Sequence, residues 1–226
     1  MLLEGLREKV IEISLKAQKE KLVPLTMGNF SARDKETGYI CITPSGMEYD
    51  KLKASDIVVA DVQGNVIDGS RKPSIETPLH CAVYRKRNDV FGVSHTHSAF
   101  ATAWASCNES IPIVVAELAA LIGGPVECAP YKPMGSIELA ETAAECLKDR
   151  HAILLANHGV LAAGPDIDAA FANSVVVEEG AKIAYYAKQI GEMRLIPEEE
   201  CKALRKMTLE KYGQKSNTSR PIFSKP

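Results

Sequence analysis

The sequence predicts an α/β protein built around a largely antiparallel sheet. Two hairpin patterns occupy residues 28–69, where short runs of β-forming residues are separated by turn residues. Two apolar runs of strand length, at residues 89–95 and 152–156, each lead into a histidine-containing segment. Helical patterns precede, separate and follow these strands. Hairpins mixed with helices in this way are typical of a layered α/β domain.

The N-terminal part of the chain begins with a predicted helix and continues with the two hairpins. Within residues 4–20, apolar side chains recur at a helical period, at Leu6, Val10, Ile13 and Ala17. The first hairpin turns at "ETG" before the β-rich run "YICIT", and the second bends at "QGN". Loops this short join antiparallel strands.

Three helical segments are predicted in the middle of the chain. Residues 73–87 are expected to form a helix with Ser74 as its cap, Glu76 in its first turn and basic residues at its end, an order that suits the helix dipole. Residues 98–107 are expected to be helical. Residues 117–124, "ELAALIGG", are expected to form a short helix that glycines terminate.

The C-terminal part contains a buried strand among three helices. Residues 136–150 show an amphipathic helical pattern, and "AILLA" at 152–156 is expected to be a buried strand ending at "NHG", followed by a loop. A long helix is predicted over residues 166–191, and a last helix over about 197–211.

Length and composition set the broad class of the protein. The 226 residues can bury a sizeable core, and we expect one domain over residues 1–212 followed by a polar tail at 213–226. A net charge of -2 gives no sign of a nucleic-acid partner. The charged N-terminus and the lack of any apolar run near ~20 residues predict no signal peptide and no membrane partner. Six scattered cysteines without a CxxC pair indicate reduced thiols in a cytoplasmic protein.

Three of the five histidines form the clearest chemical pattern. His95 and His97 flank one threonine at the end of an apolar run, and side chains at i and i+2 of a strand leave the same face, about 6.6 Å apart. A partly wet, hydrogen-bonded pair is the alternative. His158, delivered by the strand "AILLA", favours a metal site, because three neutral histidines with an open position are typical of catalytic zinc. Mn²⁺, Co²⁺ or Fe²⁺ also suit such ligands.

A carboxylate is needed if a bound metal is to take part in proton chemistry. Glu76 is the candidate, although a glutamate in a helical first turn is also common without any such role. Glu117 is a weaker candidate within an apolar stretch, where it would need a partner or a raised pKa. His80, one helical turn from Glu76, is expected to be packed and hydrogen-bonded. His151 is expected at the surface, and neither of these two histidines is assigned a function.

Small polar residues in three separate stretches could together hold an anion such as phosphate. Glycine allows close backbone approach, and hydroxyl and N–H groups donate to anions. The residues concerned are Gly28, Asn29 and Ser31 in "GNFS", Thr43, Ser45 and Gly46 in "TPSG", and Ser74 in "KPS". Each stretch alone is equally typical of an ordinary capped turn. No glycine-rich nucleotide-binding motif is present.

The motifs "GNFSAR", "ITPSGMEYDKL", "KPSIETPLH", "SHTHS", "CAPYKPMGS" and "LLANHG" occur in an order that resembles the class II aldolase/epimerase family. The resemblance spans residues 28–191. It implies a three-layer α/β/α fold with a central sheet, and a homotetramer with active sites between neighbouring subunits.

The resemblance also implies roles for individual residues. It implies that three histidines bind zinc, that Glu76 is the acid–base catalyst, that "LEKYG" supplies an assisting Tyr212, and that four residues bind phosphate. The histidines are His95, His97 and His158, and the phosphate-binding residues are Asn29, Ser45, Gly46 and Ser74. Two positions depart from the family pattern: Ile75 replaces a second serine, and Ala116 replaces a tyrosine that acts across the subunit boundary.

The function that follows from this resemblance is a metal-dependent aldolase. The expected substrate is a ketose 1-phosphate similar to L-fuculose 1-phosphate, cleaved to dihydroxyacetone phosphate and a small aldehyde such as lactaldehyde. An L-ribulose-5-phosphate 4-epimerase-like enzyme is the alternative, although such epimerases usually carry aspartate at the position of Glu76. A catalytically silent, adducin-like binding domain is a third possibility, against which the retained histidines and Glu76 argue.

Overall fold

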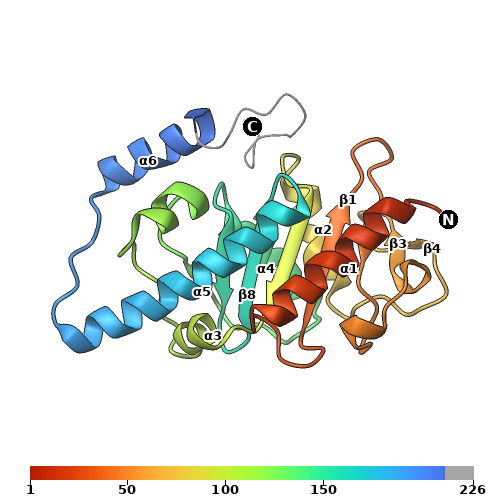
Figure 1. The fold of residues 1–226 in the computed structure, drawn as a ribbon, viewed down its shortest axis with the longest axis horizontal. Coiled ribbons are helices and arrows are strands. Elements are labelled where there is room, and N and C mark those ends of the chain that lie inside the picture. Colours follow the sequence, from red (N-terminus) through yellow and green to blue (C-terminus); the bar gives the residue numbers. More distant parts are fainter. Residues whose placement is uncertain (212–226) are drawn as a thin grey trace.

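An eight-stranded sheet forms the centre of the computed structural model, which describes residues 1–211 (Figure 1). The strand order is β4-β3-β2-β1-β5-β8-β7-β6. The strands are β1 (Gly28–Arg33), β2 (Ile40–Ile42), β3 (Val58–Ala60), β4 (Val66–Asp68), β5 (Gly92–Thr96), β6 (Cys128–Ala129), β7 (Ala152–Leu155) and β8 (Gly159–Gly164). Neighbouring strands are antiparallel except for β6 and β7. The predicted α/β fold with a largely antiparallel sheet is therefore confirmed.

Helices cover both faces of this sheet and give the three layers that the family resemblance implied. In Figure 1, α1 and α5 cross in front of the sheet, while α2 and α4 lie behind it. The helices are α1 (Glu4–Lys19), α2 (Thr77–Lys86), α3 (Ala99–Ser106), α4 (Ile137–Leu147), α5 (Ile167–Ile190) and α6 (Glu198–Lys211). No helix within this described part of the chain is both long and apolar enough to cross a membrane.

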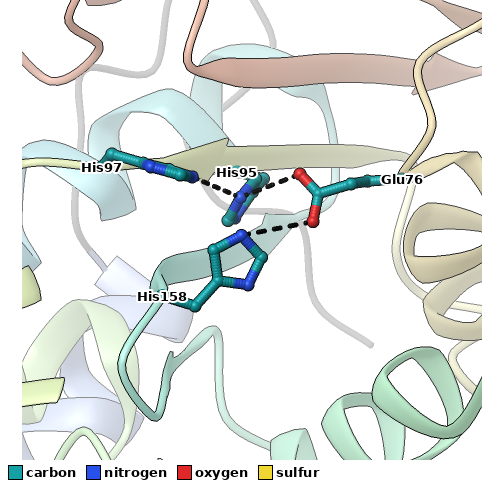
Figure 2. A group of neighbouring side chains, drawn as sticks. All are labelled: Glu76, His95, His97 and His158. Carbon is teal, nitrogen blue, oxygen red and sulfur yellow. Dashed lines mark hydrogen bonds and ion pairs between the residues drawn. The ribbon is translucent and has the colours of Figure 1, made fainter. Parts of the chain in front are cut away.

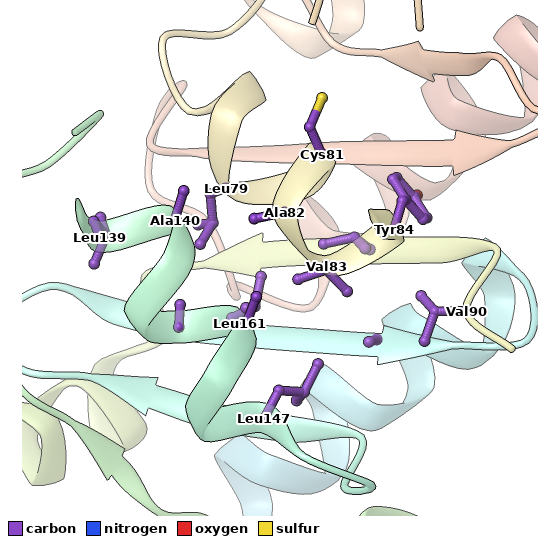
Figure 3. Packing of buried hydrophobic residues seen from close by; sticks show 14 of the residues in the cluster. Leu79, Cys81, Ala82, Val83, Tyr84, Val90, Leu139, Ala140, Leu147 and Leu161 are labelled. Carbon is purple, nitrogen blue, oxygen red and sulfur yellow. The ribbon is translucent and has the colours of Figure 1, made fainter. Parts of the chain in front are cut away.

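Side-chain alternation along the strands divides the core between the two faces. On β7, Ile153 and Leu155 pack toward α2 and α4, in the cluster that Figure 3 shows. Ala152 and Leu154 point the other way, toward α3 and α5. Val93 of β5 belongs to the α2 and α4 side, so His95, two residues further along the strand, faces that side as well.

The hairpin of β7 and β8 corrects one sequence-based expectation. The segment after His158 was expected to be a loop, but it forms β8, which pairs with β5 on one side and β7 on the other. The turn between β7 and β8 is tight: Asn157 adopts a left-handed conformation with φ of 54°, and the His158 N–H donates to the Leu155 carbonyl at 3.0 Å. His158 therefore lies in a turn beside the end of β5.

Two smaller features also differ from expectation. Helix α2 begins at Thr77, with Glu76 at its N-cap position, so Ser74 is not the helix cap. Ser74 instead closes the preceding turn, because its carbonyl accepts from the Thr77 N–H at 3.0 Å. The expected short helix at 117–124 is a single π-helical turn, η3 (Leu118–Ile122), ended by Gly123 with φ of 93°.

Candidate metal centre

Three histidines and one glutamate from distant parts of the chain meet where the central strands β5 and β8 come together at one end of the sheet. His95 and His97 come from the end of β5, His158 from the turn before β8, and Glu76 from the residue preceding α2 (Figure 2). Each offers one ligand atom, and these atoms all lie within 4.8 Å of one another. The sequence-based prediction that these four residues converge is thus met by the geometry.

The nitrogen and oxygen atoms of this group point toward a common centre. Glu76 Oε2 lies 3.1 Å from His95 Nε2, and Glu76 Oε1 lies 3.3 Å from His158 Nε2. His97 Nε2 lies 2.9 Å from His95 Nε2. The three imidazole rings are mutually edge-on, with centroids 4.8 to 5.1 Å apart. The rings are not stacked face to face, and their nitrogen atoms meet at the centre of the group.

Hydrogen bonding inside the group is incomplete in a way that fits a divalent cation. His95 Nδ1 lies 2.8 Å from the Val160 carbonyl oxygen, and donation to that oxygen leaves the Nε2 lone pair directed at the centre. Glu76 Oε1 and both ring nitrogens of His158 are buried without a hydrogen-bond partner. Buried polar atoms are normally paired. Imidazole nitrogens and carboxylate oxygens are common zinc ligands, and three histidines with an open position form a known catalytic zinc site, so the donors present fit such an ion.

Electrostatics favour neutral imidazoles at His97 and His158 and a charged carboxylate at Glu76, whereas His95 is favoured as the protonated ring. Burial, followed by the proximity of His95, lowers the pKa of His97 to about 3 and that of His158 to about 4. Burial lowers the pKa of His95 but the adjacent Glu76 carboxylate raises it, with a net upward shift. Burial likewise raises the pKa of Glu76, but His95 and the Asn29 amide outweigh it and hold the pKa well below its usual range. A ligating imidazole must be unprotonated, so a cation would take the place of the His95 proton.

The three stretches predicted to hold an anion lie side by side. The Phe30 N–H lies 3.2 Å from Thr43 Oγ1, which joins "GNFS" to "TPSG". The Ser45 N–H donates to the Lys72 carbonyl at 3.0 Å, and the Ser74 N–H donates to the Thr43 carbonyl at 3.1 Å, which joins "TPSG" to "KPS". A Cβ added at Gly46 would meet nothing within 4 Å. These stretches adjoin the group formed by Glu76, His95, His97 and His158, called the metal-ligand group below. The contact is made by Ser74 Oγ, which accepts from the Glu76 N–H at 3.2 Å.

The Asn29 side chain forms its hydrogen bonds with Glu76 and His80, and not with the other residues predicted to bind an anion. Its Nδ2 donates to Glu76 Oε2 at 2.9 Å, and its Oδ1 accepts from His80 Nε2 at 2.6 Å. The sequence reading missed the contact with Glu76. The signal was available, since Asn29 and Ser31 share one strand face while Glu76, His80 and Tyr84 recur every four residues on one helix face.

The remaining candidates lie elsewhere. Glu117 is exposed at η3 and does not belong to the metal-ligand group. His151 was expected at the surface but is only 7% exposed, bonded to Arg205. His80 is fully buried and hydrogen-bonded, as expected. Tyr212 lies outside the described residues, and Ile75 is exposed on the segment between Ser74 and Glu76.

Comparison with known proteins places these features in context. Residues 8–185 match the family model described as "Class II Aldolase and Adducin N-terminal domain". A 5-deoxy-D-ribulose 1-phosphate aldolase from Bacillus thuringiensis serovar kurstaki is 42% identical over 214 residues, which cover 95% of this chain and 100% of that protein.

Solved structures of similar proteins agree with the fold. An L-fuculose 1-phosphate aldolase is 37% identical with a TM-score of 0.87, covering 89% of this chain and 95% of that chain. The L-fuculose-1-phosphate aldolase of Thermus thermophilus is 25% identical with a TM-score of 0.72, covering 84% of this chain and 98% of that chain.

Proposed function

The chain belongs to the class II aldolase and adducin family, and from this premise we propose that it is a metal-dependent sugar-phosphate aldolase. The proposed substrate is a ketose 1-phosphate with a deoxygenated end, similar to L-fuculose 1-phosphate or 5-deoxyribulose 1-phosphate. Cleavage yields dihydroxyacetone phosphate and a small aldehyde: lactaldehyde from the first sugar and acetaldehyde from the second. The observation that carries the proposal is the convergence of three histidines and Glu76 within 4.8 Å, with unpartnered donor atoms.

The three histidines are proposed to hold the metal. His97 and His158 present neutral nitrogens, and His95 would present one once a bound cation replaced its proton. Zinc is the ion that this donor set suits best, with Mn²⁺, Co²⁺ and Fe²⁺ as alternatives. Such an ion supplies Lewis-acid polarisation of a carbonyl and stabilisation of negative charge. The Val160 carbonyl orients His95 by accepting from Nδ1–H.

Glu76 is proposed to carry the proton of the reaction. Its Oε2 is occupied by the Asn29 amide and by His95 Nε2, whereas Oε1 has no hydrogen-bond partner. In the cleavage direction, the hydroxyl that becomes the aldehyde oxygen releases a proton, and Glu76 returns one proton to the carbon that loses its bond to the aldehyde. In condensation, Glu76 removes that proton from carbon and the aldehyde oxygen takes one up. A carboxylate with one fixed and one unpartnered oxygen is suited to this exchange.

The remaining assignments complete the proposal. Asn29, Ser45, Gly46 and Ser74 bind the substrate phosphate, and Tyr212 assists the catalysis. Residues 1–212 form one domain with a polar tail at 213–226, and the protein assembles as a homotetramer with active sites at subunit interfaces. Support for these assignments comes from the family resemblance, together with the adjacency of the "GNFS", "TPSG" and "KPS" segments.

The test is an assay of the zinc-loaded protein with ketose 1-phosphates and pentulose 5-phosphates. Release of free dihydroxyacetone phosphate is expected, and Glu76→Gln should lower kcat by about 100-fold or more, in the range typical of general acid–base groups. Glu117→Gln, which alters an exposed glutamate outside the metal-ligand group, is the matched control. Epimerised pentulose phosphate without release would instead support the epimerase. Absence of bound metal with no activity on adding zinc would support an adducin-like binding domain.

A further inference from the structure

A continuous chain of buried side chains leads from Glu76 into the core between β1 and α2. Asn29 Nδ2 donates to Glu76 Oε2 at 2.9 Å, and His80 Nε2 lies 2.6 Å from Asn29 Oδ1. Beyond it, His80 Nδ1 lies 2.6 Å from Ser31 Oγ, which lies 2.8 Å from the Tyr84 hydroxyl. All five residues are at most 5% exposed, so water does not offer alternative partners along this chain.

The hydrogen bonds of this chain have a defined direction. The Asn29 Oδ1 atom only accepts, so the facing His80 Nε2 must carry a proton and donate it. A neutral imidazole protonated on Nε2 accepts at Nδ1, so the Ser31 hydroxyl must donate to His80. The Tyr84 hydroxyl then donates to Ser31, at Oγ or at the carbonyl oxygen 3.0 Å away. The protons carried by Ser31 Oγ, His80 Nε2 and Asn29 Nδ2 therefore all point toward Glu76.

Reversing the direction of these hydrogen bonds would change the group of Asn29 that faces Glu76 Oε2. If the Asn29 amide were flipped, its Oδ1 would face Glu76 Oε2, and two acceptors would oppose each other unless the carboxyl were protonated. The flipped amide would donate to His80 Nε2, and His80 would have to carry its proton on Nδ1. The tautomer of His80 thus determines, through the orientation of the Asn29 amide, whether Glu76 Oε2 faces an N–H donor or a carbonyl oxygen.

We infer that His80 and Ser31 are positioning residues for Glu76: they fix the Asn29 amide so that it donates to Oε2 and leaves Oε1 as the proton-carrying oxygen. The inference rests on the proposed role of Glu76 in aldol cleavage. The Ser31 hydroxyl is engaged by His80 and Tyr84, and His80 meets the anion-binding stretches through Ser31 and Asn29, so neither side chain is itself free to bind metal or phosphate. Tyr84 anchors the far end of the chain.

The test compares three variants with a matched control. Ser31→Ala removes the donor to Nδ1 while Tyr84 keeps its bond to the residue 31 carbonyl, and His80→Leu removes the donor to Asn29. His80→Gln replaces that donor with an amide N–H. Ser174→Ala is the control, because it also removes a fully buried, hydrogen-bonded serine hydroxyl, outside the chain.

Kinetic measurements separate a positioning role from a structural one. Ser31→Ala and His80→Leu are expected to lower kcat about 10-fold or more, a loss typical of residues that orient a reactive group. KM and zinc content should stay within about twofold, and His80→Gln should recover part of kcat. Solvent-deuterium exchange into the hydroxymethyl group of dihydroxyacetone phosphate, without aldehyde, should fall in parallel with kcat. Equal kcat in Ser31→Ala, Ser174→Ala and the parent protein would overturn the inference.

A spectroscopic readout tests the chain independently of turnover. In the zinc-loaded protein labelled with ¹⁵N-histidine, the His80 ring is expected as the Nε2–H tautomer, with its signals identified by their loss in His80→Gln. A proton on Nδ1 would overturn the inference. If no sugar phosphate is cleaved, the proposed function fails while this measurement still decides the direction of the chain. If the parent protein cleaves substrate and the variants match it, the inference fails and the function stands.

Discussion

His151 lies immediately before β7, far along the sheet from the histidines of the candidate metal centre. Its Nδ1 lies 3.1 Å from the Leu121 carbonyl oxygen, and Arg205 Nη2 lies 3.1 Å from each ring nitrogen. Burial, with the nearby Arg205 guanidinium, lowers the pKa of His151 to about 3. At neutral pH the ring is therefore uncharged: Nδ1–H donates to the carbonyl, and Nε2 accepts from Arg205.

This histidine should make stability fall as the solution is acidified. In the unfolded chain its pKa returns to about 6.5, so between pH 6.5 and about 3 the unfolded state binds a proton that the folded state does not. The free energy of unfolding then falls with decreasing pH. Between pH 7 and pH 5 the contribution of this residue falls by about 2 kcal/mol.

Urea unfolding of the parent protein and of His151→Gln, each at pH 7 and pH 5, measures this contribution. The free energy of unfolding of the parent protein minus that of the variant should be about 2 kcal/mol smaller at pH 5 than at pH 7. Other titrating groups are common to both proteins and cancel in the comparison. A difference that is the same at both pH values would show that His151 does not change its proton affinity on folding.

The N-terminus of α5 packs directly against two strands at positions where only glycine fits. A Cβ added at Gly92 of β5 would lie 2.3 Å from the Asp166 backbone, and one added at Gly164 of β8 would lie 2.8 Å from the Ala170 nitrogen. Both obstacles are backbone atoms, which cannot rotate away as a side chain does. Close approach of α5 keeps β5 and β8, the two strands that present the histidines, fixed beneath it.

Substitution at this contact should therefore be destabilising. Gly92→Ala is expected to lower the free energy of unfolding by about 3 kcal/mol, at the upper end of typical overpacking effects. Gly5→Ala in α1 is the matched control, because an added Cβ there meets nothing within 4 Å and alanine favours helix. Its stability should be unchanged or up to about 1 kcal/mol higher. Equal stability of the two variants in denaturant titrations would contradict the close contact.

Most elements were predictable from the sequence, and the exceptions have a physical cause. Helices α1, α4 and α5 carry the apolar periodicity that burial of one face requires, and the hairpins carry turn residues between β-forming runs. Strand β8 was missed because "GVLAAG" is short, contains only small and aliphatic residues, and is bounded by glycines. Its strand conformation depends on pairing with β5 and β7 on both sides, which no local pattern reports.

At the scale of the whole molecule, the candidate site depends on how distant segments are aligned. Strand periodicity alone predicted that His95 and His97 share a face. The place of His158 follows from the register of β5 and β8, in which Thr96 pairs with Val160 and so brings the preceding turn beside His97. The contacts of Glu76 with Asn29 and His95 likewise require the packing of α2 on β1 and β5. Sequence therefore indicated the residue types, and tertiary pairing supplied their partners.

A metal at this centre would connect β5, the β7–β8 turn and the start of α2, so its removal should lower the free energy of unfolding of the whole domain. A ligand that binds only the folded state adds RT ln(1 + [L]/Kd), about 4 kcal/mol when its concentration is 1,000 times Kd. For a chain of this length, that corresponds to a shift of roughly 10 °C in Tm. Without the ion, buried Glu76 Oε1 and the His158 nitrogens keep no partner.

Thermal unfolding before and after treatment with a chelator measures this coupling. Chelation should lower Tm by about 10 °C, and added zinc should restore it. His97→Ala removes one proposed ligand and should lose most of the response to zinc. His151→Gln alters a buried histidine outside the group and should keep it, so the pair separates specific ligation from general effects of losing a histidine. If both variants responded to zinc as the parent protein does, the ion would be bound elsewhere, because only ligation at this centre links the stability gain to His97.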